Sequence, residues 1–107
     1  MFIDGDILEV SKVKSLYYST IKKELDNNKR LITEVEDKIK ECIENSLSTY
    51  IHINVEKLDS CPKNPCLARN LLIYEFRRRG FYVERTLASN GINEYVFISW
   101  ESQTTKV

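Results

Sequence analysis

The sequence predicts an α+β fold in which two N-terminal helices, forming a hairpin or one long helix, precede a small β-α-β-β domain with an antiparallel hairpin. Three observations predict this fold. A helical period runs through residues 6–47, apolar and polar residues alternate over residues 50–55, and Asn90-Gly91 separates two runs rich in aromatic and β-branched residues. A chain of 107 residues has the size of one domain with a helical extension. We therefore expect a helical region over 1–47 and a β-α-β-β domain over 48–107.

Two apolar stripes mark the N-terminal helices, with residues recurring at steps of three and four as one helix face requires. Asp26-Asn27-Asn28 separates the stripes, and these short polar side chains compete with helix hydrogen bonds. We favour a helical hairpin, because one continuous helix of about 42 residues would be about 60 Å long and its stripe would need partner chains. The stripes consist of Val10, Val13, Tyr17, Ile21 and Leu25, followed by Ile32, Val35, Ile39, Cys42 or Ile43, and Leu47.

A strand and a third helix follow. The alternation over residues 50–55 places Ile51, Ile53 and Val55 on one face, which we expect to be buried. Asn64-Pro65 predicts a helix start, because asparagine caps helices and proline fits the first helical position. Gly80 predicts its end at about Arg79, since glycine adopts a left-handed backbone without a Cβ clash. The expected core stripe of this helix is Leu67, Ala68, Leu71, Leu72 and Phe76.

The Asn90-Gly91 dipeptide predicts a type I′ turn, which needs a positive φ at both central residues. A two-residue turn at this point fixes which residues of the two strands face each other. One face of the resulting hairpin is the natural core face, which we expect to receive the helix over 65–79. The predicted pairs on this face are Val83 with Ile98, Phe81 with Trp100, Arg85 with Val96, and Leu87 with Glu94.

The opposite face of the sheet gathers aromatic side chains, and we expect it to be a protein interface. Tyrosine combines a large apolar ring with a polar hydroxyl, which suits a surface that is covered by a wet interface. Three coverings are open: the N-terminal helices folded back, a second protein chain, or stacked nucleic-acid bases. Base stacking normally comes with a basic surround, whereas this face contributes Glu84. The candidate interface residues are Tyr50, His52, Tyr82, Tyr95 and Phe97.

The charges and motifs give no sign of an active site. Sixteen basic residues balance sixteen acidic ones, and neither half of the chain resembles a nucleic-acid-coating tail. The sequence lacks a glycine-rich phosphate loop and the GxSxG, HExxH and DxDxDG motifs. The single histidine, His52, has no nucleophile or orienting acid at a suitable spacing. We therefore expect no enzyme activity, no catalytic residue, no metal and no cofactor.

The cysteines and the hydropathy pattern suggest an intracellular protein. Three cysteines, Cys42, Cys61 and Cys66, are an odd number, which favours free thiols over a disulfide framework. No stretch reaches the roughly 18 apolar residues of a membrane span. The acidic N-terminus lacks the positive region of a secretory signal. We expect no membrane partner.

The C-terminal part carries a pattern that resembles known sequences. A helix ends at Gly80, Phe81-Tyr82-Val83 follows, and a second strand closes on Ile98-Ser99-Trp100. This pattern resembles small uncharacterised α+β proteins of tailed phages and large DNA viruses, over roughly the last 40 residues. The resemblance implies a viral origin, with the protein in the host cell cytoplasm or the virion, and it carries no catalytic residues.

The order of elements also resembles a degenerate winged helix. That resemblance implies that the helix over 65–79 enters the major groove and that the hairpin contacts phosphate. Three of the arginines lie in the last helical turn, where cations also complement the helix dipole, so their role stays open. The possible nucleic-acid or anion contacts are Arg69, Arg77, Arg78, Arg79 and Arg85.

The function expected from these features is a non-enzymatic viral protein–protein interaction or virion-associated structural protein that assembles with itself. Its partner is then a second copy or another viral or host protein. The alternative is a winged-helix-like module that binds nucleic acid.

Overall fold

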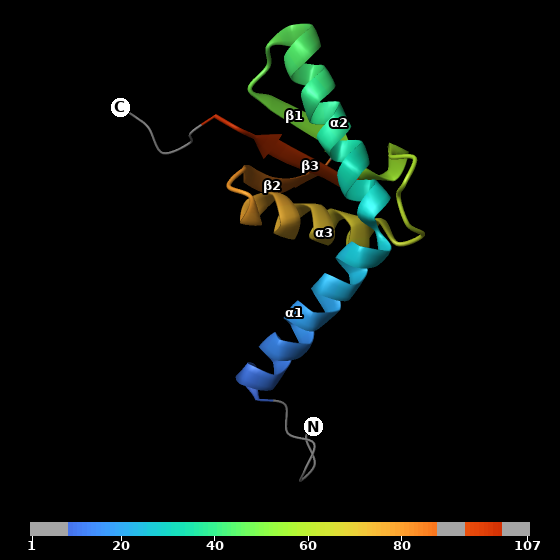
Figure 1. The fold of residues 1–107 in the computed structure, drawn as a ribbon, viewed down its shortest axis with the longest axis vertical. Coiled ribbons are helices and arrows are strands. Elements are labelled where there is room, and N and C mark those ends of the chain that lie inside the picture. The colour runs from blue at the N-terminus through green and yellow to red at the C-terminus, as the bar shows by residue number, and fades with distance from the viewer. Residues whose placement is uncertain (1–8, 88–93, 102–107) are drawn as a thin grey trace, which may run out of the picture.

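The computed structural model describes residues 9–87 and 94–101, and it confirms the α+β class and the predicted order of elements (Figure 1). Two helices come first, then a strand, a helix and two further strands. A short 3₁₀ turn, Val55–Lys57, follows the first strand. The helices are α1 (Val10–Asn27), α2 (Lys29–Ser46) and α3 (Pro65–Arg78), and the strands are β1 (Tyr50–Asn54), β2 (Tyr82–Leu87) and β3 (Glu94–Ser99).

The break between the first two helices falls at Asn28, within the predicted Asp26-Asn27-Asn28 segment. The Asn28 side chain donates a hydrogen bond of 2.8 Å to the carbonyl of Glu24, and its backbone leaves the helical region at φ −124° and ψ 38°. The two helices form neither the hairpin that we favoured nor one continuous helix. Figure 1 shows α2 continuing beyond the end of α1 at an angle, rather than turning back along it.

The sheet has the order β1-β3-β2 and is antiparallel throughout. The predicted hairpin register is confirmed, because Val83 faces Ile98 and Arg85 faces Val96. The predicted turn at Asn90-Gly91 lies outside the described residues. Phe81 and Trp100 lie just outside the paired strands, and both rest partly buried against the core. The predicted facing pairs therefore hold from Tyr82 with Ser99 to Leu87 with Glu94.

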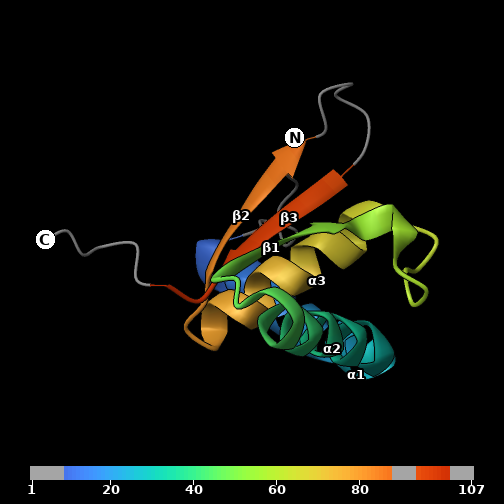
Figure 2. The same ribbon diagram turned by 90° about the horizontal axis from the view of Figure 1, so that it is seen from above.

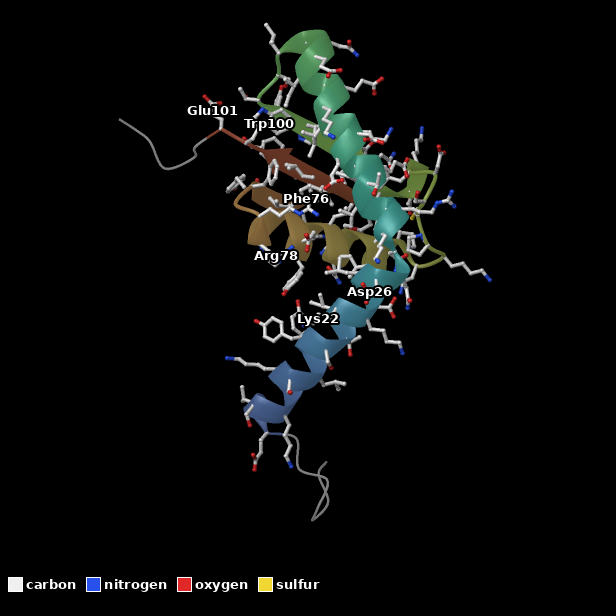
Figure 3. The ribbon with its side chains drawn as sticks, in the orientation of Figure 1. Lys22, Asp26, Phe76, Arg78, Trp100 and Glu101 are labelled. Carbon is white, nitrogen blue, oxygen red and sulfur yellow. The ribbon has the colours of Figure 1, made fainter. Side chains whose placement is uncertain are left out.

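One hydrophobic core lies between the sheet and two helices. Figure 2 shows α2 and α3 on the same side of the sheet. Phe76, labelled in Figure 3, is 1% exposed and is the largest fully buried side chain; truncating such a residue typically costs about 3–5 kcal/mol. The core combines Leu31, Ile32, Val35 and Ile39 of α2, Ala68, Leu71, Leu72 and Phe76 of α3, Ile53, Val83, Val96 and Ile98 of the sheet, and Val55 and Leu58 beyond β1.

The end of α2 differs from the predicted stripe. Ile43 is 38% exposed and Leu47 is 83% exposed, so neither belongs to the core. Leu47 instead ends the helix in the left-handed region at φ 51°, and its N–H donates to the carbonyl of Ile43. The last turn of α2 therefore does not pack its apolar residues against the sheet.

Both ends of α3 form as predicted. The Asn64 side chain accepts hydrogen bonds from the N–H groups of Cys66 and Leu67, which are two of the donors that a helix start leaves without partners. Gly80 follows the helix at φ +99° and lets Phe81 donate to the carbonyl of Phe76. This return of the chain places β2 beside α3.

Replacing Gly80 by valine will destabilise the fold by about 1–2 kcal/mol, because a β-branched residue is strained at positive φ. A Cβ built at this position meets nothing within 4 Å, so the loss reports backbone strain alone. Urea unfolding of the purified chain measures it. Gly80→Asn is the matched control and should lose less, since asparagine visits this region more readily. Equal losses for both variants would show that the position does not require positive φ.

Candidate protein-interaction surface

The five predicted interface residues lie on one face of the sheet, which we call the aromatic face: Tyr50, His52, Tyr82, Tyr95 and Phe97. The strand register brings them together, because Phe97 of the central strand faces His52 on one side and Glu84 on the other. Side chains alternate between the two faces of a strand, so these positions lie opposite the core residues Ile53, Val96 and Ile98.

Phe97 is the centre of a cluster of rings. Its centroid lies 5.0 Å from that of His52, 5.6 Å from Tyr50 and 6.0 Å from Tyr82. The two tyrosines meet Phe97 edge to face, the geometry that the ring quadrupoles favour. The outer rings remain accessible, with Tyr50 45% and Tyr82 40% exposed. The cluster is therefore ordered by its own contacts while it presents apolar ring surface.

Polar groups border the rings. The side-chain amide of Asn54 donates to the Tyr95 hydroxyl at 3.3 Å. The side-chain oxygen of Asn54, Oδ1, is buried and has no hydrogen-bond partner among the described residues. Partial desolvation raises the pKa of Tyr82 above its ordinary value of 10, and the neighbouring Glu84 carboxylate raises it further. Its hydroxyl is protonated at neutral pH in any case and can donate a hydrogen bond. The face thus combines apolar rings with polar groups at their edges, as protein interfaces do.

The first of the three possible coverings, the N-terminal helices folded back over this face, is wrong. Within residues 9–87 and 94–101, α2 packs on the opposite face with α3 (Figure 2), and α1 makes its main contacts with α3. The reason is that the apolar stripe of α2 matches the aliphatic face of the sheet, where it is needed to complete the core.

Two of the five candidate arginines share one carboxylate. Glu94 of β3 lies 2.8 Å from Arg69 of α3 and 3.3 Å from Arg85 of β2. Arg69 and Glu94 are each only 13% exposed, so this pair links the helix to the sheet within the molecule.

The other three arginines lie at the end of α3 and also have partners within the chain. Arg77 donates to the carbonyl of Val83 at 3.0 Å. The nearly buried carboxylate of Glu75 pairs with Arg78 at 2.6 Å and with Arg79 at 2.7 Å. Arg79 also pairs with Glu36 of α2. The structure therefore does not gather the five arginines into one unpartnered basic patch.

A second surface of interest lies on α1 and was not singled out as a site by the sequence. Several apolar residues of its N-terminal half are exposed: Val10 (70%), Val13 (45%), Leu16 (65%) and Tyr17 (53%). The helical period identified most of these residues, but it did not show that the stripe extends beyond the rest of the fold.

We searched the described residues for clusters of metal-ligating side chains and for helices that could span a membrane. The three cysteines are free thiols, and no three histidine, cysteine or acidic side chains in the described ranges come close enough to hold a metal ion. No helix in those ranges combines the length and apolar character needed to cross a bilayer.

Comparison with known proteins gives no match to a family model, a curated protein or a solved structure.

The Glu75 cluster predicts a pH dependence of stability. Hydrogen bonds from Arg78 lower the pKa of Glu75 from its ordinary value of 4.5, and Arg79 lowers it further against the opposing effect of burial. A carboxylate with a lowered pKa stabilises the fold above its unfolded pKa, and this contribution disappears as the pH falls through the folded value. The free energy of unfolding should therefore fall below about pH 4.5.

Glu75→Gln should lose about 1–3 kcal/mol at neutral pH and show a shallower decline in acid. Part of the decline will remain, because Arg69 lowers the pKa of Glu94 in the same way. Urea unfolding between neutral and acidic pH measures both effects, with Glu44→Gln, an exposed glutamate of α2, as the control. An acid decline as steep in Glu75→Gln as in the wild type would contradict this assignment.

Proposed function

We propose that this chain is a non-enzymatic viral interaction protein that uses its aromatic face to bind a second copy or another viral or host protein. One observation carries the proposal: the described residues cover the sheet on a single face, and the other face presents a cluster of rings around Phe97.

The composition of the aromatic face supports protein binding. Tyrosine is enriched at protein interfaces and among the residues that contribute most to binding. The rings are held by mutual contacts, so little side-chain freedom is lost when a partner covers them. The partially exposed Tyr50 and Tyr82 lie on the two outer strands with Phe97 between them, so the apolar surface is continuous across the sheet.

The proposed setting rests on the C-terminal pattern. Gly80-Phe81-Tyr82-Val83 and Ile98-Ser99-Trp100 are the residues that resemble small viral proteins. The proposed location is accordingly the host cell cytoplasm or the virion.

The alternative, a winged-helix-like module that binds nucleic acid, has less support. Arginines that contact phosphate or base edges must be available to the nucleic acid. Arg69, Arg78, Arg79 and Arg85 are in ion pairs within the chain, and Arg77 donates to a backbone carbonyl.

Photo-crosslinking from the aromatic face tests the proposal. The full chain, with p-benzoylphenylalanine in place of Tyr82, is expressed in the cells in which the protein is naturally made and irradiated. The substitution keeps an aromatic ring at an exposed position, so we expect the fold to survive. We expect a light-dependent covalent adduct with a protein, either a second copy or a different chain.

The same photo-reactive residue in place of Lys63, an exposed loop position, is the control and should give no comparable adduct. Absence of a protein adduct from both Tyr50 and Tyr82 would overturn the proposal, and an adduct with nucleic acid from Arg77 or Arg85 would favour the alternative.

A further inference from the structure

Helix α1 carries an apolar stripe, and the fold covers only the C-terminal half of that stripe. At its C-terminal end Ile21 is buried and Leu25 packs against the core. Toward its N-terminus the same stripe continues through exposed residues, of which Val10 is 70% and Tyr17 is 53% exposed. In Figure 3 the first turns of α1 extend away from the rest of the molecule. An amphipathic helix that extends beyond its domain leaves its apolar side in water unless another chain covers it.

A groove runs along this stripe and ends at α3. It has a volume of about 400 Å³ and is formed by one face of α1 and the N-terminal half of α3. Most of its walls are apolar. The α1 residues that line it recur at the spacing of one helix face, which is the pattern of a groove that receives another helix. Its lining is Val13, Leu16, Tyr17, Thr20, Ile21 and Glu24 of α1 with Leu67, Asn70 and Leu71 of α3.

We propose that the occupant of this groove is α1 of a second copy, paired antiparallel across a two-fold axis. The inference rests on the proposed function, because it names a partner for an interaction protein, but it concerns a surface separate from the aromatic face. A two-fold axis makes the contact self-complementary, so each copy both fills a groove and offers one.

The spacing of the stripe sets the alignment. Val10, Val13, Tyr17 and Thr20 follow the alternating steps of three and four that form a helix-pairing seam. In an antiparallel pair, Val13 then faces Tyr17 of the partner subunit and Val10 faces Thr20 of the partner subunit. This alignment places the exposed first turns of one helix beside Leu67 and Leu71 of the partner subunit, where the groove ends.

The antiparallel direction follows from what already covers the other half of the stripe. Ile21 and Leu25 pack within their own chain, so only the N-terminal half of each α1 is available. A parallel pair would bring both folded domains to the same end of a short contact. An antiparallel pair sends them to opposite ends and covers the exposed half of each helix with the groove of the other.

The flanking charges fit this alignment. Glu9 lies beside the seam and comes opposite Lys23 of the partner subunit, and the two-fold axis repeats this pair. The two attractive contacts outnumber one like-charge contact, between Lys14 and Lys14 of the partner subunit. In a parallel pair Glu9 would instead face Lys14 of the partner subunit, so charge exchange distinguishes the two directions.

Sedimentation equilibrium of the full chain over a wide range of concentration tests the pairing. The wild type should move from 12.6 kDa toward twice that mass. The double variant Val13→Glu/Leu16→Glu should remain at the mass of one chain, because both residues are exposed and line the groove. Tyr18→Glu is the control: it adds one negative charge at a tyrosine that is 50% exposed but outside the seam and the groove, and it should dimerise like the wild type.

Charge exchange tests the direction. Glu9→Lys alone should weaken dimerisation by about 2- to 30-fold, the range expected for two exposed ion pairs. Adding Lys23→Glu should restore it, whereas adding Lys14→Glu should not. Restoration by Lys14→Glu instead would overturn the antiparallel arrangement.

A wild type that stays at 12.6 kDa at every concentration would overturn the pairing itself. So would equal effects of Tyr18→Glu and the seam variant. The α1 variants do not alter the aromatic face, so the outcome for their dimer does not decide the proposed function. The photo-crosslinking from Tyr82 tests that function independently of α1.

Discussion

The fold depends on burial of a single face of a three-stranded sheet. Two helices, α2 and α3, share the aliphatic surface formed by Ile53, Val96 and Ile98, and the hydrophobic core lies between them. A small sheet gains its stability largely from the packing of its hydrophobic face. Both of these helices lie on one side, and α1 makes its main contacts with α3, so no helix of the described part covers the other side. The accessible rings around Phe97 and the exposed half of α1 both follow from this allocation.

The ion pairs support the same arrangement. Glu94 joins Arg69 of α3 to the sheet, and Arg79 joins the end of α3 to Glu36 of α2. These contacts fix the helices against one face of the sheet, and they occupy arginines that a nucleic-acid-binding protein would direct outward. The polar groups on the covered side therefore serve the fold, while the uncovered side carries the features of an interface. The aromatic face and these ion pairs consequently use different residues.

The sequence predicted the local features well, because short-range chemistry determines them. Asn64 caps α3 with its own side chain, Gly80 takes the positive φ expected of it, and the register deduced from Asn90-Gly91 brings Tyr82 and Phe97 to one face. Features that depend on distant contacts were not predictable. The bend at Asn28 takes its direction from the face of α2 that the sheet buries, and the pairing of Arg69 with Glu94 spans 25 residues. The ion pairs of Glu75 with Arg78 and Arg79 lie three and four residues apart on one helix, a spacing that can be read from the sequence although we did not predict them.

In a single chain, one face of the sheet is buried and the other is open to solvent. Hydroxyl-radical footprinting of the dilute purified chain, read by mass spectrometry, tests it most directly. Tyr50 and Tyr82 should be oxidised rapidly, whereas Phe76, which is 1% exposed, should be protected until the chain unfolds. Protection of both tyrosines to the level of Phe76 in a dilute single chain would contradict the claim, because it would show that the chain itself covers the aromatic face.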